Sequence, residues 1–260
     1  MAYVLRRLAL LVLILLVVSF FTYFLINLLP GDPTIAILGP SATPHAEAVL
    51  RHQLHLDQPL LVRYFEWLGN ALTGHLGRSY VNGESVATSI SQSLPVTIEL
   101  LILSQLIALV ISVPVGVYSA VRPNKLFDQV ATTVSFAGLS VPVFTISLVL
   151  VLFFAVDVHL FPATGYTGLT SNPLTNLRSV LLPSVALAVG SIAAYSRILR
   201  ADMISTLQQD FVTMARAKGL PDWYILFRHA LRPSTFTTVT VAGLQLGTLI
   251  SGAFIVEYIF

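Results

Sequence analysis

Five long stretches of this chain contain no Asp, Glu, Lys or Arg. Each is close to or longer than the ~18 to 20 residues that a helix needs to cross about 30 Å of hydrocarbon. The stretches run from Leu8 to Leu29, Leu100 to Val121, Gln129 to Val156, Ser179 to Ser196 and Pro233 to Val256. They lack the alternation of apolar and polar residues that marks a barrel strand, and backbone amides in lipid must bond within their own segment. The pattern therefore predicts an all-α polytopic membrane protein with five spans.

The first stretch follows Arg6 and Arg7, as the apolar core of a secretory signal peptide would. It is longer than such a core, which has about 7 to 15 residues, and no small-x-small cleavage site follows it. We therefore interpret this stretch as a retained membrane anchor.

Composition agrees with a membrane protein and excludes several other classes. Hydrophobic residues make up 55% of the chain, charged residues only 10%, and the mean hydropathy is +0.83. The chain has no cysteine, which excludes disulfides, iron–sulfur clusters and thiolate zinc sites. The net charge of +2 gives no reason to expect a nucleic acid partner.

Basic residues fall unevenly on the two sides of the predicted membrane. With a cytoplasmic amino terminus, the inner side holds Arg6, Arg7, Arg122, Lys125, Arg197, Arg200, Arg216, Lys218, Arg228 and Arg232. The long first outer loop is exempt from the charge rule, and without it only Arg178 remains outside. We therefore expect a cytoplasmic amino terminus.

Three connecting segments are long enough to carry structure of their own. The first outer loop, residues 31–95, has apolar residues at helical spacing over 61–68, which predict a short amphipathic helix that begins near Pro59. The second outer segment, 157–178, has the composition of turns. The long inner loop, 201–232, holds the residues on which the functional interpretation depends.

Residues 202–218 of this inner loop favour a helix that ends at Gly219 in a left-handed cap. Pro221 is placed to open a second short helix that extends to Ala230. The loop is thus predicted to form a helix-turn-helix against the cytoplasmic face. Small residues at the turn, Ala215, Ala217 and Gly219, would let another protein's backbone approach closely, and the cations between them could fix the register.

The stretch Thr213 to Gly219, Thr-Met-Ala-Arg-Ala-Lys-Gly, resembles the EAA loop of permease subunits of ATP-binding-cassette importers, in the dipeptide and oligopeptide permease B branch. Two positions depart from the general motif, because Thr213 stands in place of Glu and Arg232 in place of Pro. The likeness continues along the chain at residues 29–33, 56–68, 77–79, 161–165, 181–183 and 243–247.

This resemblance implies a type I importer in the plasma membrane of a prokaryote. Two related permease subunits would enclose the pore, two ATPase domains would grip the inner loops, and an extracytoplasmic binding protein would deliver short peptides, nickel or haem. Coupling to the ATPase would fall on Thr213, Met214, Ala215, Arg216, Ala217, Lys218, Gly219 and Leu220. We call residues 201–232 the coupling loop.

The motor is expected in a partner chain, which would bind ATP and Mg²⁺. The two lysines, Lys125 and Lys218, precede Leu126 and Gly219, so no Gly-Lys-Ser/Thr phosphate loop is possible here. We expect no cofactor and no catalytic site in the chain itself. Family members also continue into a sixth span, so we expect these 260 residues to be part of a longer protein.

The chain as a whole and some of its single features allow other interpretations. A secondary transporter would show internal repeats and intramembrane charges, neither of which is evident. The coupling loop could instead be an ordinary solvated loop. We interpret the outer-loop histidines His45, His52 and His55 as solvated rather than as a metal site, Glu99 as an interfacial anchor, and Pro114 and Pro142 as kinks.

Overall fold

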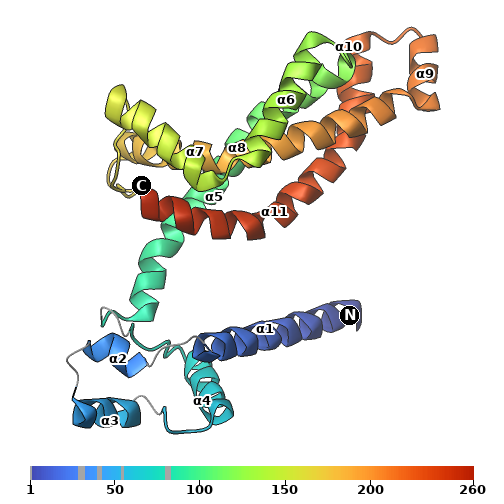
Figure 1. Ribbon diagram of the computed structural model, residues 1–260. Helices are drawn as coiled ribbons and strands as arrows, with labels where there is room; N and C mark the ends of the chain where they lie inside the picture. Colours follow the sequence, from blue (N-terminus) through green and yellow to red (C-terminus); the bar gives the residue numbers. More distant parts are fainter. Residues whose placement is uncertain (1, 29–32, 40–42, 54–55, 80–82) are drawn as a thin grey trace. The chain divides into compact units, whose positions relative to one another are not determined.

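The computed structural model describes residues 2–28, 33–39, 43–53, 56–79 and 83–260. Over these ranges the chain forms helices and one isolated β-bridge, between Arg78 and Ser85, but no strand (Figure 1). The all-α prediction is confirmed. The chain divides into two compact units, residues 1–92 and 93–260, which are described separately.

The first unit contains the amino-terminal apolar helix and the outer segment that follows it. Its helices are α1 (Ala2–Leu28), α2 (Pro33–Leu38), α3 (Pro44–Gln53) and α4 (Leu60–Leu72), with the first residues of α5 (Val86–Val121). The amphipathic helix predicted near Pro59 is confirmed as α4, which begins one residue after that proline. Proline suits this place because its ring sets φ and a helix start needs no donor there.

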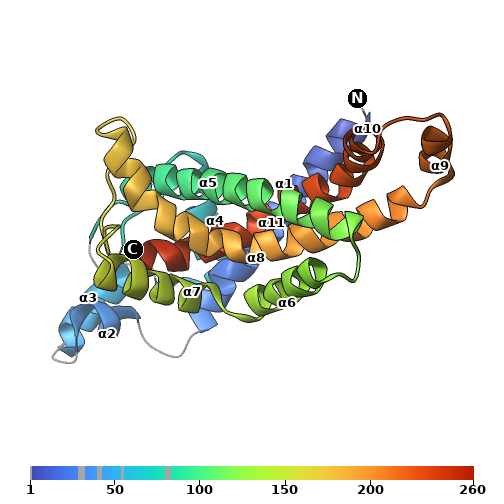
Figure 2. The ribbon, with the colours of Figure 1, turned by 90° about the horizontal axis from the view of Figure 1, so that it is seen from above.

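The second unit is a helical bundle arranged around α8. Its elements after α5 are α6 (Leu126–Ser140), α7 (Val143–Leu150), η1 (Val151–Asp157), α8 (Pro173–Leu207), α9 (Asp210–Ala217), α10 (Asp222–Tyr224), η2 (Ile225–Leu231) and α11 (Arg232–Ile259). In Figure 2, α8 runs between α5 on one side and α6 with α7 on the other. Two of these elements, η1 and η2, are π-helical turns.

A stripe of small residues on α5 lets this helix pack closely on its neighbours. Ser104, Ala108, Ser112, Gly116 and Ala120 recur at every fourth position, and all five are buried. A Cβ atom on Gly116 would lie 3.0 Å from the Ser196 carbonyl oxygen of α8. Small residues at such spacing allow backbones to approach, which is how membrane helices gain packing energy without a hydrophobic drive between them.

Among the residues that the structure describes, four helices are long and apolar enough to cross a membrane: Tyr3–Leu25, Val86–Val121, Pro173–Leu207 and Asp222–Ile259. The third predicted span, expected as one helix over 129–156, is instead two helical segments with a bend of 103° between them. It makes a fifth span only if the bent pair is counted as one.

The bend in the third span occurs at Val141 and Pro142. Proline cannot donate to the preceding turn and pushes the residue before it out of the helical region. Val141 accordingly has φ −90° and ψ 124°, and α7 starts only after Pro142. The expected effect of Pro142 is therefore stronger than a kink, whereas Pro114 lies inside the continuous helix α5.

Candidate functional site

The coupling loop begins as a continuation of α8. The predicted helix over 202–218 is not a single helix, because α8 ends at Leu207 and α9 starts at Asp210. The break lies at Gln208 and Gln209, and Gln209 has an extended backbone with ψ 150°. Figure 1 shows α9 as a separate short helix beyond the end of α8.

The turn after α9 is closed by a glycine cap. Gly219 has φ +77°, its N–H donates to the Arg216 carbonyl at 2.9 Å, and the Leu220 N–H donates to the Ala215 carbonyl at 3.3 Å. These two bonds are those of a Schellman motif, which needs a left-handed residue at the position of Gly219. The cap predicted at this glycine is confirmed.

The second leg of the coupling loop is not a separate short helix. Pro221 does precede its first turn, as predicted, but α10, η2 and α11 follow one another without a break and count as one helix over Asp222–Ile259. Pro233 fails to stop the helix because it lies in the first turn of α11, directly after the wide π-turn η2. A π-turn leaves room for a proline ring that an α-helical turn would exclude.

A small apolar core holds the turn together. Val212 and Ala215 on α9 pack with Ile225 on η2, and all three are buried. Leu207 and Leu220 pack against this cluster. Ala215 thus lies inside the coupling loop, although it was grouped in the sequence with the residues that a partner would approach.

The outer surface of the coupling loop combines apolar side chains with cations. Thr213, Arg216, Ala217, Lys218 and Gly219 are exposed, and Leu220 is half-buried. Large apolar residues in the same loop are exposed as well: Trp223 at 65%, Met214 and Phe227 at 57%, and Phe211 at 46%. Such residues are enriched at protein interfaces, and methionine adapts to varied partners. Composition alone pointed to the cations and missed the aromatic residues.

The two legs of the coupling loop are joined where they leave the bundle. The hydroxyl groups of Thr206 on α8 and Ser234 on α11 lie 3.0 Å apart, and Ser234 donates to the Ala230 carbonyl at 2.8 Å. Leu199, Met203 and Ala230 form a buried cluster beside them. A force on the turn would therefore reach both long helices.

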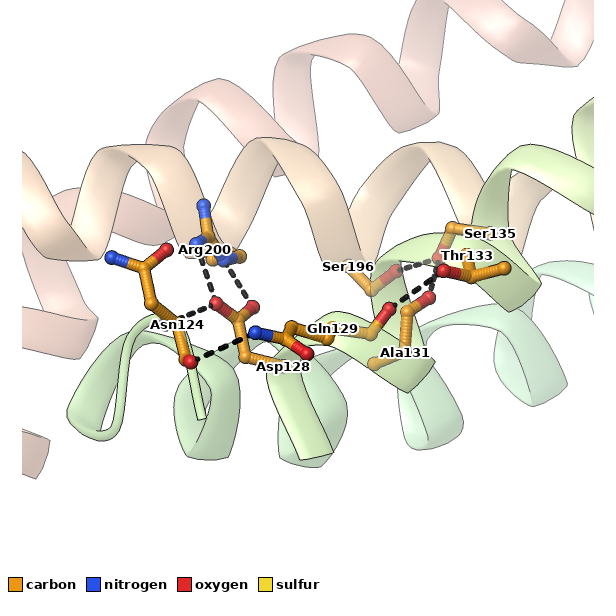
Figure 3. A network of polar contacts seen from close by, with 8 residues as sticks. All are labelled: Asn124, Asp128, Gln129, Ala131, Thr133, Ser135, Ser196 and Arg200. Carbon is orange, nitrogen blue, oxygen red and sulfur yellow. Dashed lines mark hydrogen bonds and ion pairs between the residues drawn. The ribbon is translucent and has the colours of Figure 1, made fainter. Parts of the chain in front are cut away.

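An ion pair between Asp128 and Arg200 fixes α6 to α8 directly before the coupling loop (Figure 3). Asp128 is 3% exposed and binds the Arg200 guanidinium with both carboxylate oxygens, one contact being Nη2 to Oδ2 at 2.6 Å. The backbone N–H of Asn124 donates to the same carboxylate at 2.8 Å, and Asn124 takes the left-handed conformation, φ 62°. Nothing local in the sequence pairs two residues so far apart, and sequence reasoning missed this contact.

The opposite end of the second unit is tied by the segment between η1 and α8. This segment is irregular, as predicted for 157–178, but residues 173–178 belong to α8 instead. Tyr166 donates to Glu99 at 2.8 Å, the Gly165 N–H donates to the Phe260 carbonyl at 2.9 Å, and Asn176 donates to the Thr167 carbonyl at 2.8 Å. Burial, and then the bond to Glu99, raise the pKa of the Tyr166 hydroxyl. Glu99, which lies more than three turns after the start of α5, therefore has a specific hydrogen-bond partner in Tyr166.

The outer-loop histidines are described only in part. His45 and His52 lie on α3, while His55 falls outside the described residues. No group of three or more His, Asp or Glu side chains with the geometry of a metal site occurs among the described residues.

Comparison with known proteins finds the same kind of relative along the whole chain. Residues 112–260 match the model of binding-protein-dependent transport system inner membrane components, and residues 1–101 match that of the amino-terminal part of such components. A protein of Brucella suis biovar 1 (strain 1330) named as a peptide transport system permease is 36% identical over 259 residues, covering 100% of this chain and 82% of the relative.

Two further relatives are named for peptide transport. The oligopeptide transport system permease protein AppB of Bacillus subtilis (strain 168) is 34% identical over 100% of this chain and 83% of the relative. The di/tripeptide transport system permease protein DppB of Pseudomonas aeruginosa (strain UCBPP-PA14) is 35% identical over 100% of this chain and 84% of the relative. The resemblance inferred from the coupling loop is thereby confirmed. The chain belongs to the family of inner membrane permease components of binding-protein-dependent transport systems.

Proposed function

We propose that this chain is a pore-forming permease subunit of an ATP-driven importer of short peptides, and that residues 213–220 couple it to separate ATPase subunits. The observation that carries the proposal is the capped turn between α8 and α11, with its exposed apolar and cationic surface. Family membership supports the transport role, and the relatives' names support peptides as cargo.

The coupling loop has the mechanical properties that such a role requires. Its own core of Val212, Ala215 and Ile225 makes the turn rigid, and its legs continue into two long membrane helices. A displacement imposed on α9 by an ATPase would therefore tilt α8 and α11 together. Two such loops pushed towards each other would open the pore on the opposite side of the membrane.

Partner recognition would rest on the exposed residues. Met214 and Trp223 would fill apolar pockets of the ATPase, and Arg216 and Lys218 would face its acidic groups. Gly219 supplies the cap that holds these residues in place. The cytoplasmic placement of this surface, and of the amino terminus, is part of the proposal and is supported by the excess of arginine and lysine on that side.

The complete importer would contain further chains. We propose a second homologous permease subunit, two ATPase domains that bind ATP and Mg²⁺, and an extracytoplasmic binding protein that delivers the peptide. Peptide, oligopeptide, di/tripeptide and glutathione transport are the functions named in the relatives, so short peptides are a better cargo than nickel or haem.

A glycine substitution tests the coupling role. An L-residue in the left-handed conformation costs about 1–2 kcal/mol, so Gly219→Val should distort the cap and abolish ATP-driven uptake of a labelled dipeptide by proteoliposomes. Gly219→Asn is the matched control, because asparagine tolerates this conformation, and it should keep most of the uptake. Both variants should insert normally in the membrane.

Two outcomes would count against the proposal. If Gly219→Val transports as well as Gly219→Asn, the cap has no coupling role. If uptake continues without ATP when an ion gradient is imposed, the chain is a secondary transporter. A direct check uses Met214→Cys in this cysteine-free chain, which should form a crosslink with the ATPase subunit.

A further inference from the structure

The helix α4 presents three different faces around its axis. Tyr64 and Trp67 lie on the side that meets α1. Glu66 and Asn70, with Arg63, form a polar face. A third face carries apolar side chains that touch little of the described chain, namely Leu61, Phe65 and Leu72, which are 56%, 65% and 80% exposed.

The contact between α4 and α1 lies within the membrane span of α1, several residues before the carboxyl-terminal end of that span. The Tyr64 hydroxyl is 2.9 Å from the Ser19 hydroxyl and donates to the Leu16 carbonyl at 3.3 Å, and its ring packs edge-on against Phe20. Tyr64 is 3% exposed, so this contact is well packed. The span itself extends from Tyr3 to Leu25.

The depth of this contact follows from helix geometry. Ser19 precedes Leu25 by six residues, which corresponds to about 9 Å along a helix axis. Amphipathic helices that lie in a membrane surface bury their apolar face about 5–10 Å into the headgroup and acyl boundary. The contact also reaches Leu16, nine residues or about 14 Å before Leu25, so it holds α4 at this depth or deeper, well short of open water.

We infer that α4 lies in the bilayer leaflet at the carboxyl-terminal end of α1, with Leu61, Phe65 and Leu72 against lipid acyl chains. Lipid is the occupant that fits, because α4 packs on α1, a membrane span whose own apolar surface is exposed, with Phe21 at 56% and Leu25 at 60%. Glu66 and Asn70, on the other side of α4, would face the headgroups and water. The indole of Trp67, which is 38% exposed, suits this boundary.

This arrangement gives α4 a specific task. A helix held by both α1 and lipid would keep the segment that follows the first span at a fixed height above the membrane. The inference does not depend on the coupling role of residues 213–220, nor on which side of the membrane the amino terminus lies. Its failure would leave the proposed function untouched, and the reverse also holds.

Spin labels test the inference directly, because the chain has no native cysteine. Phe65→Cys and its neighbour Glu66→Cys are labelled in the full transporter, reconstituted in vesicles of phosphatidylethanolamine and phosphatidylglycerol. Collision of each label with oxygen, which concentrates in lipid, is compared with collision with a water-soluble nickel chelate. The ratio of oxygen to nickel collisions should be several-fold higher at position 65 than at position 66.

Two results would overturn the inference. Equally low ratios at positions 65 and 66 would place both faces in water. A label at 65 that neither reagent reaches would mean that a second permease subunit or the binding protein covers this face. Leu72→Cys, at the most exposed apolar position of α4, gives a second reading if Phe65→Cys does not assemble.

Discussion

Replacing Arg200 with methionine should destabilise this protein far more than replacing its partner, Asp128, with asparagine. The two side chains form a bidentate pair between α6 and α8, but they are buried to different degrees (Figure 3). The Asp128 side chain is 3% exposed and that of Arg200 is 27% exposed. The cost of losing a partner should therefore depend on which of the two charges is left behind.

The magnitudes follow from that difference. Arg200→Met leaves a buried carboxylate with the Asn124 N–H as its remaining donor, and an uncompensated buried charge of this kind costs about 3–5 kcal/mol. Asp128→Asn leaves a guanidinium whose flexible stem can carry it towards water, and the new amide can still accept from Asn124, so the cost should be about 1–2 kcal/mol. The double variant carries neither charge and should also lose only about 1–2 kcal/mol.

Unfolding of the purified chain in mixed micelles, with the denaturing detergent increased stepwise and helicity followed by circular dichroism, measures these free energies. Arg197→Met is the matched control. Arg197 lies one turn away on the same helix and stacks on Phe136 at 4.2 Å, a contact worth about 0.5–1 kcal/mol. The reasoning is refuted if Arg200→Met costs no more than Arg197→Met, or if Asp128→Asn costs as much as Arg200→Met.

Two further predictions concern packing inside the second unit. Gly116→Ala places a methyl group 3.0 Å from the Ser196 carbonyl oxygen and 3.1 Å from the Leu199 Cβ. This crowding should lower the free energy of unfolding by about 1–3 kcal/mol. Gly247→Ala is the control, because its methyl group would meet nothing within 4 Å and should lower the free energy of unfolding little or raise it. Tyr195 is 0% exposed, and its hydroxyl donates to the Gln105 side chain at 2.9 Å. Tyr195→Phe removes this hydrogen bond and should lower the free energy of unfolding by about 1 kcal/mol. Tyr258→Phe, at a residue that is 90% exposed, should cost nothing measurable in the same detergent titration, and equal losses in the two tyrosine variants would contradict the argument.

Element type was predictable from the sequence because lipid restricts the choice so strongly. Three of the five charge-free stretches lie wholly within continuous helices, and the first does so up to Leu28, the last residue described there. The local rules for Pro59 and Gly219 placed a helix start and a helix end correctly. Helix boundaries were less predictable. The helix α5 begins at Val86, well before the apolar stretch at Leu100, because a helix can continue past polar residues and Pro95 where water or protein satisfies its backbone.

Parts of the coupling loop that depend on contacts between distant residues could not be read from the chain. The spacing of Ala215, Ala217 and Gly219 indicates a small-residue surface, but only the packing of Ala215 against Ile225 shows that the first of the three faces inwards. The same holds for the exposed Trp223, which has no special position in the motif. Burial decides such roles, and burial is a property of the folded loop.

Some contacts between helices could be predicted from a local sequence pattern, and others could not. Small residues at every fourth position of α5 are a local pattern, and this pattern alone would have predicted its buried face. Asp128 and Arg200 offer no such pattern, because each is an ordinary charge at the end of an apolar stretch until the fold brings them together. A charge that looks like a positive-inside signal can thus be a structural contact instead. Counting basic residues predicts which side of the membrane a loop occupies. Only the fold shows which arginines hold helices together, such as Arg200, and which lie exposed on the surface, such as Arg216.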